Sequence, residues 1–290
     1  SFIASSNCLL FERVKPVFVD IDERTYNLDV TQIESKMTER TKAILPVHVF
    51  GQPADMTEIM RIAKKYDLYV IEDACEAIGA EWNDRRAGSF GDISVFAFYP
   101  NKQITTGEGG VLLTDHERAY IDACSLRNQG RNPNSAWLEH DRIGYNYRMS
   151  DLQAAVGLAQ LERLADITAL RKQAAERYIR YIRERGVDIR FPQVLAPARM
   201  SWFVFVVLLP EYTNRQRVMV YLAKHGIQSR PYFPDIHLQP AYRKRFGYKP
   251  GTYPISEKQS ARTLAIPFYT RIDKEEQKYV TERLAEAVER

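Results

Sequence analysis

A lysine between a predicted strand and a glycine-rich turn is the first feature of this sequence that could do chemistry. Lys102 follows the apolar run 95–98, and Pro100 ends that run because proline cannot continue a strand ladder. A turn with three glycines (107–110) comes next, and the apolar run 111–113 re-enters the sheet. Open α/β sheets bind ligands at the carboxyl ends of their strands. The amine of Lys102 is therefore a candidate reactive group, although an isolated loop lysine is more often simply solvated.

Two carboxylates follow a neighbouring predicted strand. Asp73 comes just after the apolar run 68–71, and Glu76 lies three residues further on. An aspartate at this place either caps the next segment or pairs with a ligand cation. An amine and a carboxylate on neighbouring strand ends are the pair that pyridoxal phosphate chemistry requires. The amine forms a Schiff base, and the carboxylate keeps the pyridine nitrogen protonated.

Alternating apolar strands and amphipathic helices predict the frame that positions these groups. The predicted strands cover 16–21, 43–49 and 68–71, and the predicted helices cover 27–40 and 55–66, the latter capped by Asp55. This spacing indicates an α/β fold with a mainly parallel sheet and helices on both faces. Later predicted elements are a helix over 116–127, a long helical region from a Ser150–Gln153 capping box to about 185, strands over 201–209 and 227–229, and helices over 214–225 and 274–288.

These elements suggest three parts. We expect a large cofactor-binding domain over 1–150, a connecting long helix over 151–186 and a small C-terminal α+β domain over 187–290. The sequence opens without Met in what resembles the middle of a folded element, so we expect the large domain to lack its N-terminal part. The polar loop 128–142 is long enough to act as a lid over a site, although such a loop is more often solvent cover.

Composition excludes several classes of protein. The 290 residues carry a formal net charge of +4 with no basic block, which gives no case for nucleic-acid binding. No apolar run is long enough to span a membrane. The three cysteines are far apart and form no CxxC pair, so we expect reduced thiols, a cytoplasmic location and no metal site.

Several long motifs recur in the order found in the DegT/DnrJ/StrS family of sugar aminotransferases, which the chain resembles over nearly its whole length. They are K-P-V-F-V-D-I-D (15–22), P-V-H-V-F-G-Q-P-A-D-M (46–56), I-E-D-A-C-E-A-I-G-A (71–80), F-A-F-Y-P-N-K-Q-I-T-T-G-E-G-G (96–110), G-Y-N-Y-R-M-S-D-L-Q-A-A-V-G-L-A-Q-L-E (144–162) and P-Y-F-P-D-I-H-L-Q-P-A-Y (231–242). The last motif is similar to family members that make 4-amino sugars such as perosamine. The resemblance implies the type I aminotransferase fold.

The resemblance also implies roles for individual residues. Lys102 matches the lysine that binds pyridoxal phosphate and moves the substrate proton, and Asp73 matches the carboxylate facing the pyridine nitrogen. Glu76 stands near the cofactor's ring hydroxyl. Asn146 matches an asparagine that reaches the cofactor phosphate of the other subunit, which implies a homodimer with shared active sites. The substrate candidates that follow more weakly are Arg127, Arg230 and His237.

Two departures from the family pattern bear on cofactor binding. The family's upstream Gly-Thr-Ala turn, which holds the phosphate, is not in this sequence. Ala97 replaces the serine that the family usually has five residues before the lysine.

The implied reaction transfers an amine from L-glutamate, through pyridoxamine phosphate, to a keto sugar on a nucleotide, most simply a 4-keto-6-deoxy hexose for amino-sugar and surface polysaccharide synthesis. Two alternatives are a pyridoxamine-dependent sugar dehydratase, against which Lys102 argues, and a non-catalytic dimeric binding or regulatory relative.

Overall fold

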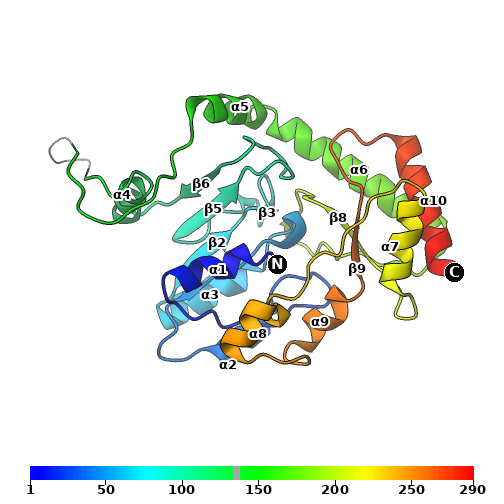
Figure 1. The fold of residues 1–290 in the computed structure, drawn as a ribbon, viewed down its shortest axis with the longest axis horizontal. Coiled ribbons are helices and arrows are strands. Elements are labelled where there is room, and N and C mark those ends of the chain that lie inside the picture. The colour runs from blue at the N-terminus through cyan, green and yellow to red at the C-terminus, as the bar shows by residue number, and fades with distance from the viewer. Residues whose placement is uncertain (133–137) are drawn as a thin grey trace.

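A four-stranded mixed sheet lies at the centre of the structure, a computed structural model that describes residues 1–132 and 138–290. Its strands are β1 (Ala43–Ile44), β2 (Tyr69–Asp73), β5 (Ile93–Ala97) and β6 (Gly110–Leu113), in the order β1-β2-β5-β6. The first three are parallel, whereas β6 runs antiparallel to β5. The predicted α/β fold class is therefore confirmed, with an antiparallel edge strand (Figure 1).

Helix α3 (Met56–Tyr66) packs its apolar stripe against β1 and β2. The Asp55 side chain accepts a hydrogen bond from the Glu58 N–H, so the predicted cap is confirmed. The buried side chains of this core are Ile33, Ile44, Ala54, Met56, Ile59, Ile62, Ala63, Val70 and Trp82. This packing fixes the direction of β2, whose carboxyl end carries Asp73.

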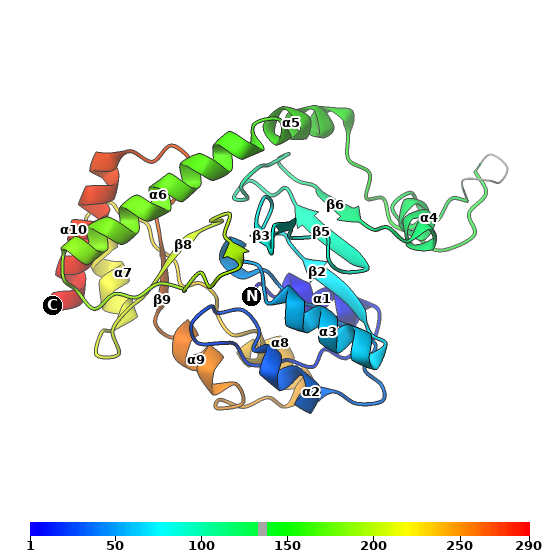
Figure 2. The ribbon, with the colours of Figure 1, turned by 180° about the vertical axis from the view of Figure 1, so that it is seen from behind.

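A second apolar core lies under the long helical region. α5 (Asp151–Leu161) begins at the predicted capping box, and α6 (Leu164–Glu184) continues towards the C-terminal part. α6 packs with α10 (Lys274–Glu289), α10 packs with α7 (Arg215–Lys224), and β8 (Phe205–Leu208) pairs with β9 (Thr263–Ile266). Figures 1 and 2 show α5 and α6 running along the opposite side of the molecule from α1, α3, α8 and α9. The expected single helix is interrupted at residues 162–163, and no proline or glycine there explains the break.

Part of the C-terminal region packs against the N-terminal region. α8 (Pro240–Phe246) and α9 (Pro254–Ser260) lie beside α1 (Ala4–Phe11) and α2 (Ile33–Lys36) (Figures 1 and 2). The Asp20 carboxylate accepts hydrogen bonds from the N–H groups of Ile255 and Ser256, at the start of α9. The proposed boundary between a large domain and a small domain thus stays a prediction.

Several predicted elements are shorter than expected or wrong. The segment 16–21 is extended but forms only an isolated bridge from Ile21 to Leu28. The predicted strand 43–49 is reduced to β1 and a parallel bridge from Val47 to Asp73. The predicted helix 27–40 is wrong apart from a 3-10 turn (Val30–Gln32) and the four residues of α2. The Asn27 side chain instead bridges to the backbone of Val49, Gln52 and Pro53, so the helix cannot begin there. Residues 227–229 form no strand, and 201–209 form only β8.

One side of the molecule exposes apolar side chains. They belong to β6, to α4 (Glu117–Leu126), to the segment 143–149 and to α5. The members are Val111, Leu112, Leu113, Tyr120, Ile121, Leu126, Ile143, Tyr145, Tyr147, Met149, Leu152, Val156, Leu158 and Leu161.

Residues 133–137 of the expected lid loop lie outside the described residues. Three short strands, β3 (Glu81–Trp82), β4 (Arg85–Arg86) and β7 (Ala198–Arg199), form a separate small sheet. Across the described ranges, none of the helices has the length and apolar character needed to cross a membrane.

Candidate active site

The amine of Lys102 lies in a semi-enclosed position beside a carboxylate and an aromatic ring. Its Nζ atom is 3.8 Å from Glu76 Oε1 and 4.4 Å from the centre of the Phe203 ring. The lysine side chain is only 15% exposed. Among the described residues, no acceptor lies within hydrogen-bond distance of this Nζ. Lys102 is therefore not a solvated loop lysine, and its amine keeps free bonding capacity.

The loop after β5 is held by side-chain contacts to three other segments. The Lys102 N–H donates to the Tyr99 carbonyl (2.9 Å) and forms the turn that carries the amine. The buried Gln103 side chain donates to the Glu76 carbonyl and to Ser201 Oγ. Gln160 at the end of α5 accepts from the Thr105 N–H and donates to the Thr105 carbonyl. These contacts fix the lysine relative to both the sheet and the helical region.

Asp73 ends β2, on the strand next to β5. Residue Asp73 is in register with Val95, and its Oδ2 atom accepts a 2.6 Å hydrogen bond from Ser5 Oγ. Its Oδ1 atom accepts from the Cys75 N–H at 3.1 Å. Asp73 also lies close enough to the other two residues to interact electrostatically, because burial, Asp73 and Lys102 all act on the pKa of Glu76: burial raises it most, Asp73 raises it further and Lys102 lowers it. The structure thus brings together three of the predicted site residues.

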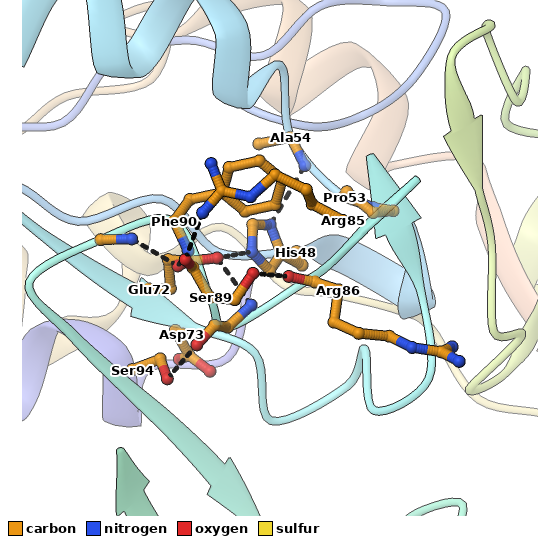
Figure 3. Close-up of polar contacts among 12 residues, drawn as sticks. His48, Pro53, Ala54, Glu72, Asp73, Arg85, Arg86, Ser89, Phe90 and Ser94 are labelled. Atoms are coloured by element: carbon orange, nitrogen blue, oxygen red, sulfur yellow. Dashed lines mark hydrogen bonds and ion pairs between the residues drawn. The ribbon is translucent and has the colours of Figure 1, made fainter. Parts of the chain in front are cut away.

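Glu72, next to Asp73, anchors the same strand end from the opposite face, since successive strand residues point to opposite sides. Its buried carboxylate accepts four hydrogen bonds of 2.6 to 3.0 Å, from the backbone N–H groups of Gly88, Phe90 and Gly91 and from His48 Nε2 (Figure 3). His48 Nδ1 accepts from the Ala54 N–H, so Nε2 is the ring nitrogen that donates to Glu72. Burial acts to raise the pKa of Glu72, but these hydrogen bonds outweigh it and hold the pKa below its usual range.

Glu76 is almost completely buried and only partly neutralised. Its Oε2 atom accepts from the Phe50 N–H at 2.9 Å, and its other oxygen faces Lys102. Burial raises the pKa of Glu76 to about 7, against the opposing effects of Lys102 and the Phe50 N–H. The site therefore holds a carboxyl group that changes charge near neutral pH, next to an amine.

Glu76→Gln is expected to change how stability depends on pH. A glutamate in an unfolded chain titrates near pH 4.3, so between about pH 4.5 and 7 the folded protein binds more protons at this position than the unfolded one. Wild-type stability relative to the variant should therefore fall by about 2–3 kcal/mol as pH rises from 5 to 8. Urea unfolding of both proteins across this range measures the difference. The Glu108→Gln variant, at an exposed position, is the control. If the difference in unfolding free energy between wild type and Glu76→Gln did not change with pH, the buried environment assigned to Glu76 would be contradicted.

Asn146 and Arg127 lie together, away from the contacts described above. The segments 126–130 and 142–147 pair through their backbones, with the Tyr147 N–H donating to the Arg127 carbonyl at 2.9 Å. Asn146 forms an isolated bridge with Asn128 and is exposed. Tyr145 stacks on Tyr147 with ring centres 4.7 Å apart. The structure does not bring Asn146 or Arg127 into contact with Lys102 of the same chain.

The two other substrate candidates occupy different places. His237 is buried, and its Nε2 lies 2.9 Å from Glu257 Oε1. It lines a cavity of about 120 Å³ together with Phe50, Tyr232 and Asp235. Arg230 is exposed and pairs through its backbone with Ala265, on a separate surface hollow beside α7. The two residues therefore do not share a cavity.

Some residues that shape this cluster were not foreseen. Phe203 lies about a hundred positions from Lys102 in sequence, and no local pattern connects the two. Ser5 contacts Asp73 from α1, a helix whose N-terminus has no capping side chain. The sequence therefore contained no sign of this helix or of the contact. Gln103, next to the lysine, was the only one that adjacency could have suggested.

The donor set fits pyridoxal phosphate at its reactive end and its ring. An amine with free bonding capacity suits the cofactor's carbonyl carbon, and a carboxylate on the neighbouring strand end suits a protonated ring nitrogen. Ala97 lies in β5, paired with Gly110, and offers no side-chain hydroxyl to a phosphate. The described residues thus include groups suited to the cofactor's carbonyl carbon and ring nitrogen. They offer fewer groups suited to its phosphate.

Comparison with known proteins assigns the family. The model of the DegT/DnrJ/EryC1/StrS aminotransferase family matches residues 1–285, and the chain belongs to this family. This confirms the resemblance predicted from the motifs.

The relatives and solved structures that it matches carry related names. The chain is 41% identical over 244 residues to GDP-perosamine synthase of Caulobacter vibrioides, covering 83% of this chain and 66% of that protein. It is 36% identical over 280 residues to a UDP-N-acetyl-3-dehydro-alpha-D-glucosamine 3-aminotransferase of Acidithiobacillus ferrooxidans, covering 95% and 72%. The structure of the Helicobacter pylori aminotransferase PseC superposes with a TM-score of 0.92 at 26% identity, covering all of this chain and 78% of that one. The type I aminotransferase fold is thereby confirmed. The chain spans about two thirds to four fifths of the lengths of these proteins.

Proposed function

We propose that this protein transfers an amino group from L-glutamate to a keto sugar carried on a nucleotide, with pyridoxal phosphate as cofactor. The observation that carries the proposal is the Lys102 amine, enclosed by Glu76 and Phe203 and set beside the strand end that bears Asp73. Relatives with 33–41% identity include GDP-perosamine synthases and a nucleotide-sugar 3-aminotransferase, which supports the substrate class.

The cofactor, when bound, supplies a ring that accepts electrons and a carbon that carries the amino group between donor and acceptor. Lys102 would hold the cofactor at its carbonyl carbon and move a proton at the substrate carbon that gains or loses the amine. Asp73 would face the ring nitrogen and keep it positively charged. Glu76, which exchanges a proton near neutral pH, would lie by the ring hydroxyl, and the Phe203 ring excludes water from one side of the amine.

We further propose a homodimer with shared active sites in the cytoplasm. The apolar surface that β6, α4, the segment 143–149 and α5 leave exposed supports this arrangement, because exposed apolar side chains favour burial against a partner. Asn146 lies within that surface and would reach the cofactor phosphate in the other subunit. Its exposed position, away from Lys102 of its own chain, is compatible with that role.

A substrate panel tests the proposal. The purified protein, supplied with pyridoxal phosphate and L-glutamate, is incubated with GDP-, UDP- and dTDP-linked sugars that carry a keto group at C3 or at C4. Mass spectrometry follows 2-oxoglutarate and the amino sugar. We expect both products in equal amounts with at least one 4-keto-6-deoxy sugar.

Other outcomes would revise particular parts of the proposal. Cofactor uptake without turnover of any keto sugar would contradict the substrate class. Loss of a sugar hydroxyl without 2-oxoglutarate would indicate the dehydratase reaction. Failure to take up the cofactor would favour the non-catalytic binding protein.

A further inference from the structure

The carboxylate of Asp73 is held from two directions. The Cys75 N–H, in the loop that follows β2, donates to Oδ1 at 3.1 Å. The Ser5 hydroxyl donates to Oδ2 at 2.6 Å, across 68 positions of sequence. One oxygen is therefore fixed by the strand's own loop, whereas the other depends on where α1 lies.

Helix α1 has few internal features that would fix its position. Its N-terminal residue Ile3 makes no side-chain cap, and Ser6 is its single buried residue. The phenol oxygen of Tyr242, on α8, lies 2.7 Å from Ser6 Oγ and 2.9 Å from Asn7 Oδ1. Tyr242 is itself only 1% exposed. Figures 1 and 2 show α8 lying alongside α1. A buried tyrosine from the C-terminal part thus anchors the helix that carries Ser5.

We propose that Ser5 is a positioning residue for Asp73, and that Tyr242 keeps Ser5 in place through α1. The proposal rests on the proposed function, in which Asp73 faces the cofactor's ring nitrogen. A hydroxyl that donates to a carboxylate oxygen restricts the rotation of the carboxylate. The carboxylate keeps unoccupied lone pairs to receive the ring N–H. Ser5 therefore holds the Asp73 carboxylate in a fixed orientation towards the ring.

A double-mutant cycle tests whether Ser5 acts through Asp73. Pyridoxal phosphate affinity is measured by visible absorbance, and the free energy of unfolding without cofactor by urea titration, for wild type, Ser5→Ala, Asp73→Ala and the double variant. We expect Ser5→Ala to weaken cofactor affinity about tenfold in the wild-type background, the loss of one hydrogen bond to a charged group, and to have no effect in the Asp73→Ala background. Ser5→Thr keeps the hydroxyl and should restore the affinity.

Matched controls separate this role from general loss of packing. Ser94→Ala removes a buried hydroxyl on the neighbouring strand that donates to the Gly88 carbonyl, not to a carboxylate, and should leave cofactor affinity unchanged. Tyr242→Phe should weaken the affinity in the same direction as Ser5→Ala. Tyr178→Phe, which removes a buried phenol bonded to the Pro267 carbonyl, should lower stability without changing the affinity.

Each outcome has one interpretation. Equal losses from Ser5→Ala in both Asp73 backgrounds, or no loss in wild type, would overturn the proposal. If wild type takes up no cofactor, the proposed function fails and the cofactor-positioning role fails with it. The unfolding cycle then still decides whether Ser5 fixes Asp73, because strictly additive losses there would show that the two side chains act independently.

Discussion

Replacing Lys102 with alanine is expected to lower kcat by about 10³-fold or more, because the amine is both the attachment point and the proton carrier. The rest of the site should remain folded. Lys102 makes one 3.8 Å ion pair and an aromatic contact, so its removal breaks no hydrogen bond of the loop. Turnover of the keto sugar and the circular dichroism spectrum together measure the two effects.

Two further lysine variants sharpen this prediction. Lys102→Arg keeps a positive charge beside Glu76 but is always protonated, so it should be as inactive as alanine. Lys172→Ala removes an exposed lysine on α6 paired at 3.8 Å with Glu176 and should retain wild-type turnover. Substantial turnover by Lys102→Arg would mean that the charge, not a transferable proton, is what this position supplies.

Removing the Glu72 carboxylate is expected to give the largest loss of stability. Glu72→Ala leaves three part-buried backbone N–H groups and the buried His48 Nε2–H without their acceptor. The unfolding free energy should therefore fall by about 3–5 kcal/mol, the range found when one partner of a buried charged network is removed. Urea unfolding monitored by fluorescence measures it. Because the pKa of Glu72 is held below its usual range, the wild-type advantage over the variant should be largest at neutral pH and should shrink as acid protonates the Glu72 carboxylate in the folded protein.

Glu34 provides the matched comparison. Its carboxylate also accepts four hydrogen bonds, one each from Arg61 and Tyr66 and two from Lys65, but on the surface, where water replaces lost hydrogen bonds. Glu34→Ala should change stability little. Similar losses for the two variants would contradict the view that burial makes the Glu72 network stabilising.

The sequence predicted best where local and global signals agree. The Asp55 cap and the amphipathic stripe placed α3 correctly, and the Ser150–Gln153 box placed the start of α5. The sequence predicted worst where the residues that a segment contacts are distant in the sequence. Residues 16–21 have strand composition but no ladder partner, and Asn27 bridges to 49–53, which replaces the expected helix. Hydrophobic pattern indicates which residues can be buried, not what covers them, and the apolar side chains of α5 are exposed.

For the candidate site, proximity in sequence determined what could be foreseen. Lys102, Asp73 and Glu76 follow neighbouring strands, so sheet topology alone predicts their approach. Phe203 and Ser5 reach the same cluster from distant segments through packing that no short motif encodes. The roles of Asn146, Arg127, Arg230 and His237 stay predictions, since the described chain does not bring them to Lys102.

The proposed reaction depends above all on a covalent bond between Lys102 and pyridoxal phosphate. Incubating the protein with the cofactor, reducing it with borohydride and mapping the modified peptide by mass spectrometry tests this most directly. We expect one phosphopyridoxyl group per chain, on Lys102, and none on the Lys102→Ala variant. Modification of another lysine at the same stoichiometry, or none at all in protein that turns over a keto sugar, would contradict it.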